Sequence, residues 1–235
     1  MNKNGPGYYP GYHTLDQQNF WDETTRKVVL NRVHHVPEIR FFSPGEAQLM
    51  DAVCARIVPQ DDRDPAQRIP IVPWIDERLF TGRGDGYRFE DMPPDGEAYQ
   101  LGLRGIEEIA RHLHGRGFSE ISIAEQDQIL EMLHDARPPA AHDIWKKMAV
   151  HRFWMLLVQD CVTFYYAHPW AWDEIGFGGP AYPRAYMRLE RGEPEPWEKD
   201  EKREEWTAPG SSLSEKFTHV AGLAEHRGGP QGGTH

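Results

Sequence analysis

The stretch from residue 145 to residue 186 constrains the fold of this chain more than any other. Its first half is the most apolar segment of the sequence, and its second half is the densest run of aromatic residues, glycines and prolines. Within the first half, Arg152, Gln159 and Thr163 share only a narrow polar stripe at helical spacing. A helix that is apolar on nearly every side has to be buried by other parts of the folded protein. We therefore predict a helix over residues 142–167 that is covered almost all round, followed by an ordered aromatic loop.

The segments before this stretch carry signals for amphipathic helices. Ser43 precedes Pro44 and Glu46, and Ser122 precedes Glu125, so both serines can cap a helix whose glutamate bonds back to the cap. Apolar residues then recur at spacings of three and four, which is typical of helices with one buried face. The sequence predicts an all-α fold, an irregular bundle of about five to six helices around a buried central helix. These helices are expected at residues 22–35, 44–58, 71–80, 95–114, 122–137 and 142–167.

Composition divides the chain into three parts. Residues 1–40 are an N-terminal arm that begins rich in Gly, Pro and Tyr and holds one short helix from Asp22. Residues 41–188 contain the remaining helix signals and form the predicted domain. Residues 189–235 are charged and then rich in Gly, Ser and Pro, so we predict a largely disordered tail.

Charge and hydropathy limit the classes of partner. The formal net charge of -11 opposes binding to nucleic acid or to an anionic membrane surface, since both are negatively charged. The longest uncharged apolar runs, 153–159 and 161–172, are shorter than the roughly 20 residues of a membrane-spanning helix. The first residues contain neither an apolar signal segment nor a twin arginine. We expect a cytoplasmic protein that neither binds nucleic acid nor inserts into a membrane.

One motif suggests metal chemistry. Glu131 and His134 have the Glu-x-x-His spacing that places two ligands on one helical face in di-iron bundles. That chemistry needs two such motifs and two further carboxylates, and only one such motif is present. A small helical metal-dependent enzyme with His and Glu ligands is therefore the alternative function, not the preferred one.

The two cysteines leave three possibilities open. Cys54 and Cys161 both fall in apolar helical segments, which favours reduced, buried thiols. A disulfide between them and a disulfide from one of them to another chain are the alternatives. Either disulfide would require an oxidising compartment.

The aromatic loop at 168–180 can close the end of the bundle or form a contact surface. It contains Trp170, Trp172 and Phe177, and rigid aromatic residues of this kind dominate protein interfaces. Trp197 and Trp206 lie in the acidic tail, where no core is available to them, and add to the second possibility. We predict that the aromatic residues of the loop and the turn after them contact a partner.

Five segments occur in an order and spacing that match a known family. They are FFSPGEAQLMDAVCARIVPQDD at 41–62, IVPWID at 71–76, YQLGLRGIEEIA at 99–110, GFSEISIAEQDQILEML at 117–133, and FWMLLVQDCVTFYYAHPWAWDEIGFGGPAYPRAY at 153–186. On these segments, roughly residues 41–188, the chain resembles the gluconate 2-dehydrogenase subunit 3 family. Its members are small accessory subunits of flavin-dependent glucose/methanol/choline-type dehydrogenases.

The resemblance implies a helical subunit that is not an enzyme and has no cofactor of its own. Such a subunit binds a large catalytic subunit that holds FAD and oxidises a sugar or polyol, and it stabilises or matures that partner. Family members often carry a twin-arginine signal, which this chain lacks. A cytoplasmic complex and export to the periplasm with a signal-bearing partner are therefore both open.

The resemblance also carries over positions at the end of the domain, as structural or interface residues only. These are Tyr165, Tyr166, Pro169, Gly176, Gly179 and Tyr182. With the aromatic loop they give the predicted partner interface: Tyr165, Tyr166, Pro169, Trp170, Trp172, Phe177, Gly178, Gly179, Pro180 and Tyr182. No catalytic, cofactor-binding or metal-binding residue is predicted.

Overall fold

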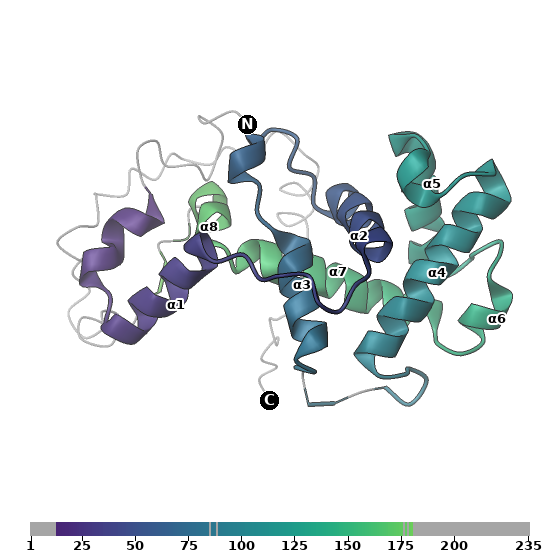
Figure 1. Ribbon diagram of the computed structural model, residues 1–235, viewed down its shortest axis with the longest axis horizontal. Helices are drawn as coiled ribbons and strands as arrows, with labels where there is room; N and C mark the ends of the chain where they lie inside the picture. The colour runs from purple at the N-terminus through teal and green to yellow at the C-terminus, as the bar shows by residue number, and fades with distance from the viewer. Residues whose placement is uncertain (1–12, 85, 88, 176, 178, 181–235) are drawn as a thin grey trace, which may run out of the picture. The chain divides into compact units, whose positions relative to one another are not determined.

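The computed structural model describes residues 13–84, 86–87, 89–175, 177 and 179–180, and these residues form helices and connecting segments without a strand (Figure 1). The predicted all-α fold is confirmed. No helix within the described residues is long and apolar enough to cross a membrane. The helices are η1 (Thr14–Phe20), α1 (Glu23–His34), α2 (Pro44–Ile57), η2 (Pro65–Gln67), α3 (Ile71–Phe80), α4 (Asp95–His114), η3 (Phe118–Glu120), α5 (Ile123–His134), α6 (His142–Trp145), α7 (Val150–Tyr166) and α8 (Pro169–Ile175).

Local sequence signals fix several helix ends. In α2 the Ser43 amide donates to Glu46 Oε2 at 2.9 Å, and in α5 the Ser122 amide donates to Glu125 Oε2 at 2.7 Å, which completes both predicted capping boxes. Gly115 ends α4 with φ of 69°, a conformation that glycine adopts without steric cost. These ends follow from a few neighbouring residues, so the sequence predicts them well.

The main core lies between α7 and the helices α2, α3, α4 and α5, with α3 crossing α7 (Figure 1). Phe153 and Leu157 of α7 are fully buried in it. Close approach of α4 to α7 depends on Gly102, because a Cβ atom there would lie 2.0 Å from the Phe153 ring. Gly105, one turn further along α4, accommodates the ring of Trp145 of α6 in the same way, at 2.4 Å.

Asp76 fixes the segment that leads into α2. This carboxylate of α3 is fully buried and accepts hydrogen bonds from the backbone amides of Arg40, Phe41 and Phe42 at 2.8–2.9 Å. Buried carboxylates are stable in proteins when their oxygens are satisfied in this way. Asp76 therefore ties the chain before α2 to α3.

Residues 142–167 form two helices, so the single predicted helix is wrong in this detail. α6 ends at Trp145 and α7 begins at Val150. Between them Ala149 is extended, and its amide donates to the carbonyl oxygen of Asp91 at 3.3 Å. That partner lies far away in the sequence, before α4, so the apolar pattern alone gives no sign of the break.

The prediction that the central helix is covered almost all round is also wrong. One face of α7 carries buried residues, including Phe153 and Leu157, whereas Met155, Val162 and Tyr166 are 56%, 39% and 44% exposed. The two sets lie on opposite sides of the helix at helical spacing. An apolar pattern shows that a face is suited to burial, but it does not show which chain covers that face.

Gly102→Ala is expected to lower the free energy of unfolding by about 1–3 kcal/mol, because the added methyl group overpacks the contact with Phe153. Gly45→Ala is the matched control, since a Cβ at this exposed position of α2 meets nothing within 4 Å. The control is expected to hold or slightly raise stability through helix propensity. Urea denaturation measures the stability of both variants. Equal urea midpoints for Gly102→Ala and Gly45→Ala would contradict the close α4–α7 contact.

Candidate partner interface

The corner between α7 and α8 holds half of the predicted interface residues. His168 separates the two helices, and its buried ring caps α8, because Nδ1 accepts a hydrogen bond from the Trp170 amide at 3.2 Å. Pro169 occupies the first helical position, which suits its fixed backbone angle. The segment predicted as an aromatic loop is therefore helical over Pro169–Ile175, and the His-Pro pair is the signal that marks its start.

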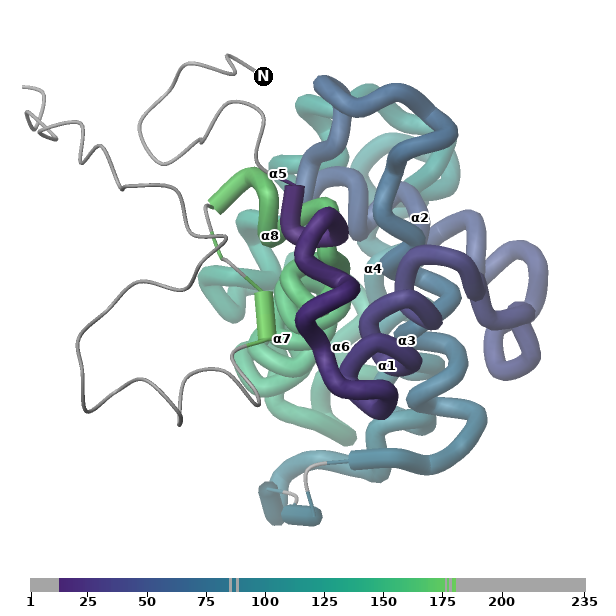
Figure 2. The backbone as a smooth tube through the Cα atoms, turned by 90° about the vertical axis from the view of Figure 1, so that its left-hand side faces the viewer, coloured from purple at the N-terminus to yellow at the C-terminus, as the bar shows by residue number. Residues whose placement is uncertain are grey.

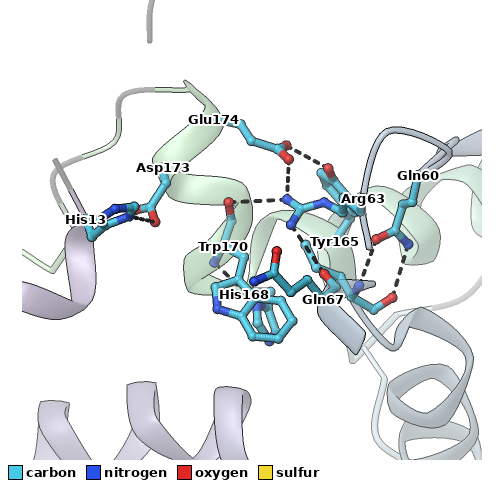
Figure 3. A network of polar contacts seen from close by, with 10 residues as sticks. His13, Gln60, Arg63, Gln67, Tyr165, His168, Trp170, Asp173 and Glu174 are labelled. Atoms are coloured by element: carbon cyan, nitrogen blue, oxygen red, sulfur yellow. Dashed lines mark hydrogen bonds and ion pairs between the residues drawn. The ribbon is translucent and has the colours of Figure 1, made fainter. Parts of the chain in front are cut away.

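An arginine from the segment after α2 clamps this corner (Figure 3). Arg63 forms an ion pair with Glu174 of α8 and donates to the carbonyl oxygens of Trp170 and Gln67 at 3.3 and 3.4 Å. Tyr165 of α7 donates its hydroxyl to the other oxygen of Glu174 at 2.6 Å. The side chains of Arg63 and Glu174 are only 12% and 15% exposed, so solvent screens the pair weakly. The network fixes the orientation of α8 relative to α7.

Two titratable groups at this corner, Tyr165 and His168, hold fixed protonation states near neutral pH. Burial raises the pKa of Tyr165 to about 12, and the hydrogen bond to Glu174 adds to the shift. Burial lowers the pKa of His168 to about 4, and the positive charge of Arg63 lowers it further. The phenol thus keeps its proton and the imidazole stays neutral, so both serve as positioning groups for α8.

A second, smaller hydrophobic core lies between α8 and the N-terminal part of the chain. Trp172 is 6% exposed and packs with Trp21 and Val29 from the N-terminal part of the chain. Its indole nitrogen donates to the carbonyl oxygen of Tyr166 at 2.6 Å. The alternative that the tryptophans close the bundle therefore fits Trp172, whose ring is covered by this chain itself.

Residues before α1 lie along α8 (Figure 2). The Thr14 amide donates to Asp173 Oδ1 at 2.8 Å, and the Thr14 hydroxyl donates to the carbonyl oxygen of Phe177 at 3.1 Å. Gly179 has φ of 83°, and a Cβ atom there would lie 2.6 Å from the Thr14 methyl group. Only glycine fits this contact without strain. η1, which the sequence analysis did not predict, thus holds the chain that follows α8.

The predicted interface residues divide by exposure. Tyr166 and Phe177 are exposed, and Trp170 and Pro180 are half-buried. Tyr165, Pro169, Trp172 and Gly179 are buried within the chain. Gly176, Gly178 and Tyr182 lie outside the described residues. A partner-binding role for these positions stays a prediction, with Tyr166 and Phe177 the best presented.

The sequence analysis missed the outer face of α7 as a candidate surface. Met155, Val162 and Tyr166 are separated by seven and four residues, so they form one stripe along the helix. The spacing of these three residues indicates a common face, but the many apolar residues around them led to the interpretation that every apolar residue of this helix is buried in the core. We call these three residues the α7 stripe.

The other candidate residues are placed as follows. Cys54 and Cys161 are buried, free thiols that face each other. Glu131 and His134 are exposed on α5, and His134 contacts Asp135 at 3.0 Å. Within the part of the chain that the structure describes, no group of three or more His, Cys, Asp or Glu residues is placed to hold a metal ion.

Acid is expected to destabilise the fold through His168. Its pKa is about 4 in the folded chain against an ordinary 6.5, so its contribution is fully present above pH 6.5 and is lost as the pH falls towards 4. The free energy of unfolding falls by about 3 kcal/mol over this pH range. His168→Asn keeps a capping acceptor but cannot titrate, and should flatten the fall of the urea midpoint over this range. His112→Asn, at an exposed position, should show the same fall of the urea midpoint as the wild type. An equal dependence of the midpoint on pH in both variants would contradict this role of His168.

Comparison with known sequences identifies the family to which the chain belongs. The family model for gluconate 2-dehydrogenase subunit 3 matches residues 44–179, which is more than half of the chain and runs from the start of α2 past the end of α8. No curated protein and no solved structure gives a match. The matched range contains the α7 stripe, the Arg63 clamp and the capped α8. The chain belongs to the gluconate 2-dehydrogenase subunit 3 family.

Proposed function

We propose that this chain is the non-catalytic accessory subunit of an FAD-dependent sugar or polyol dehydrogenase of the glucose/methanol/choline type. It binds the catalytic subunit and stabilises or matures it, while FAD and the oxidation belong to that partner. The family to which the chain belongs is described as a dehydrogenase subunit, which supports a role in an assembly. The complex resides in the cytoplasm or, where the partner bears an export signal, in the periplasm.

The observation that carries this proposal is the α7 stripe. Isolated apolar side chains are common on protein surfaces, whereas exposed apolar side chains that recur on one face of a well-packed helix are typical of an interaction site. On α7 they share this face with the exposed Gln159. Met155, Val162 and Tyr166 are each more than a third exposed, although the opposite face of the same helix fills the main core. α7 therefore presents the stripe rigidly, which lowers the entropic cost of binding.

A groove beside the stripe extends this surface. It has a volume of about 710 Å³, and its lining includes Tyr87, Phe89, Met155 and Leu156. The Arg152 guanidinium lies 3.6 Å from the centre of the Phe89 ring, and this arginine also pairs with Asp91. Aromatic residues and arginine are the side chains that contribute most to protein interfaces.

The stripe also reaches the predicted aromatic interface at the α7–α8 corner. Trp172 hydrogen-bonds to Tyr166 at the end of the stripe, and its ring packs edge-on against Phe177 with 5.4 Å between ring centres. The Phe177 ring and the backbone of Tyr166 thus both contact one buried tryptophan. A partner that covers the stripe can contact Phe177 in the same interface.

Met155→Gln combined with Val162→Gln is expected to weaken the complex by tenfold or more in Kd, because the partner loses two apolar contacts of the interface. The test co-expresses the chain with a candidate partner, an FAD-dependent dehydrogenase of the glucose/methanol/choline type from the same organism, and measures co-purification, flavin content and dehydrogenase activity. The isolated double variant should keep its melting temperature, since both positions are exposed.

The matched control is Leu113→Gln combined with Ile123→Gln, which changes two exposed apolar residues on α4 and α5. This control should bind the flavoprotein as the wild type does. Equal binding by the stripe variant and the control would exclude the α7 stripe as the interface. A flavoprotein that is soluble, flavin-loaded and active to the same extent without this chain, and that forms no complex with it, would overturn the proposed function itself.

A further inference from the structure

The two cysteines of the chain meet in the main core although they are 107 residues apart in sequence. Cys54 lies on α2 and Cys161 on α7, and their sulfur atoms are 3.6 Å apart. We propose that they form an intrachain disulfide that closes as the chain folds in the presence of a disulfide oxidant and that locks α2 to α7.

The geometry favours this pairing over the other possibilities. A disulfide has an S–S distance of about 2.05 Å, so the two sulfur atoms need to approach by only about 1.5 Å. Cys54 is 4% exposed and Cys161 is fully buried, so neither thiol can reach a cysteine of another chain without unfolding. Because the chain has two cysteines, the thiol available to each within the folded chain is that of the other.

The same burial determines when the bond can form. A hydrogen bond with Cys161, together with burial, raises the pKa of Cys54 well above its ordinary value. Thiol–disulfide exchange needs a thiolate and access to the oxidant, and the folded chain offers Cys54 neither. The reduced native protein should therefore resist oxidation, and the bond should close during folding, before the core excludes the oxidant.

The chemistry balances through ordinary thiol–disulfide exchange. The thiolate of one cysteine attacks a sulfur of the oxidant's disulfide, which gives a mixed disulfide and releases the first thiolate of the oxidant. The thiolate of the second cysteine then attacks the protein sulfur of that mixed disulfide and displaces the second thiolate. The protein loses two protons and two electrons, and the oxidant is reduced to two thiols.

The bond should stabilise the fold, because it would join α2 to α7 across a loop of more than one hundred residues and so restrict the unfolded chain. It would tighten a contact that already exists in the core. We expect the melting temperature of the oxidised protein to exceed that of the reduced protein by about 5–10 °C.

The test refolds the full chain from denaturant with either oxidised glutathione or dithiothreitol. After oxidative refolding we expect both thiols to be unreactive in denaturant, a monomer on a non-reducing gel, and one cross-linked peptide pair containing Cys54 and Cys161 by mass spectrometry. The melting temperature should fall when dithiothreitol reduces the bond. Native reduced protein should keep both thiols during the same incubation with oxidised glutathione.

Cys54→Ala and Cys161→Ala serve as controls. Whatever its own stability, each variant should melt at the same temperature with and without dithiothreitol, so a general loss of stability cannot imitate the effect. Free thiols after oxidative refolding, a lasting adduct with glutathione, a disulfide-linked dimer, or a bond that leaves the melting temperature unchanged would each overturn the proposal. Rapid oxidation of the native reduced protein would contradict closure during folding.

Discussion

One buried carboxylate sets the orientation of the helix on which the rest of the fold depends. Asp160 of α7 accepts hydrogen bonds from the Tyr99 hydroxyl of α4 at 2.6 Å and from Arg78 of α3 at 2.5 Å, and Arg78 also binds Asp95 at 2.6 Å. Burial alone would lower the pKa of Arg78, but the two carboxylates raise it overall and keep the guanidinium charged. Removing one partner from such a buried pair typically costs about 3–5 kcal/mol. Because Asp160 must point inwards, the rotation of α7 is fixed, and the face with Met155 and Val162 must point outwards.

The sequence predicts the parts of this fold that depend on neighbouring residues. The capping boxes at Ser43 and Ser122 and the glycine after α4 set helix ends locally, so they could be read directly. The break before Val150 could not, because it depends on a hydrogen bond between Ala149 and Asp91. The start of α8 lies between these cases: its His-Pro signal is local, but the dense run of aromatic residues, glycines and prolines around it suggested a loop.

The candidate site was predicted only in part, for a related physical reason. Hydropathy identifies side chains that avoid water, but burial of Trp172 depends on Trp21 and Val29, which come from far earlier in the chain. Conversely, Val162 is as apolar as a core residue and yet remains exposed. Which apolar residues are covered is a property of the assembled chain. The cysteine pair is a further example, since only the packing of α2 on α7 brings the two sulfur atoms together.

α7 is the structural axis of the bundle, because its Asp160 side holds the neighbouring helices, and we propose that its opposite side receives the catalytic subunit. Hydrogen–deuterium exchange, measured on the isolated chain and on its complex with the proposed FAD-dependent catalytic subunit, tests this claim most directly. We expect slower exchange along α7 and around Phe177 in the complex, with unchanged exchange in α5 around Ile123. Protection confined to other helices, with none along α7, would contradict it.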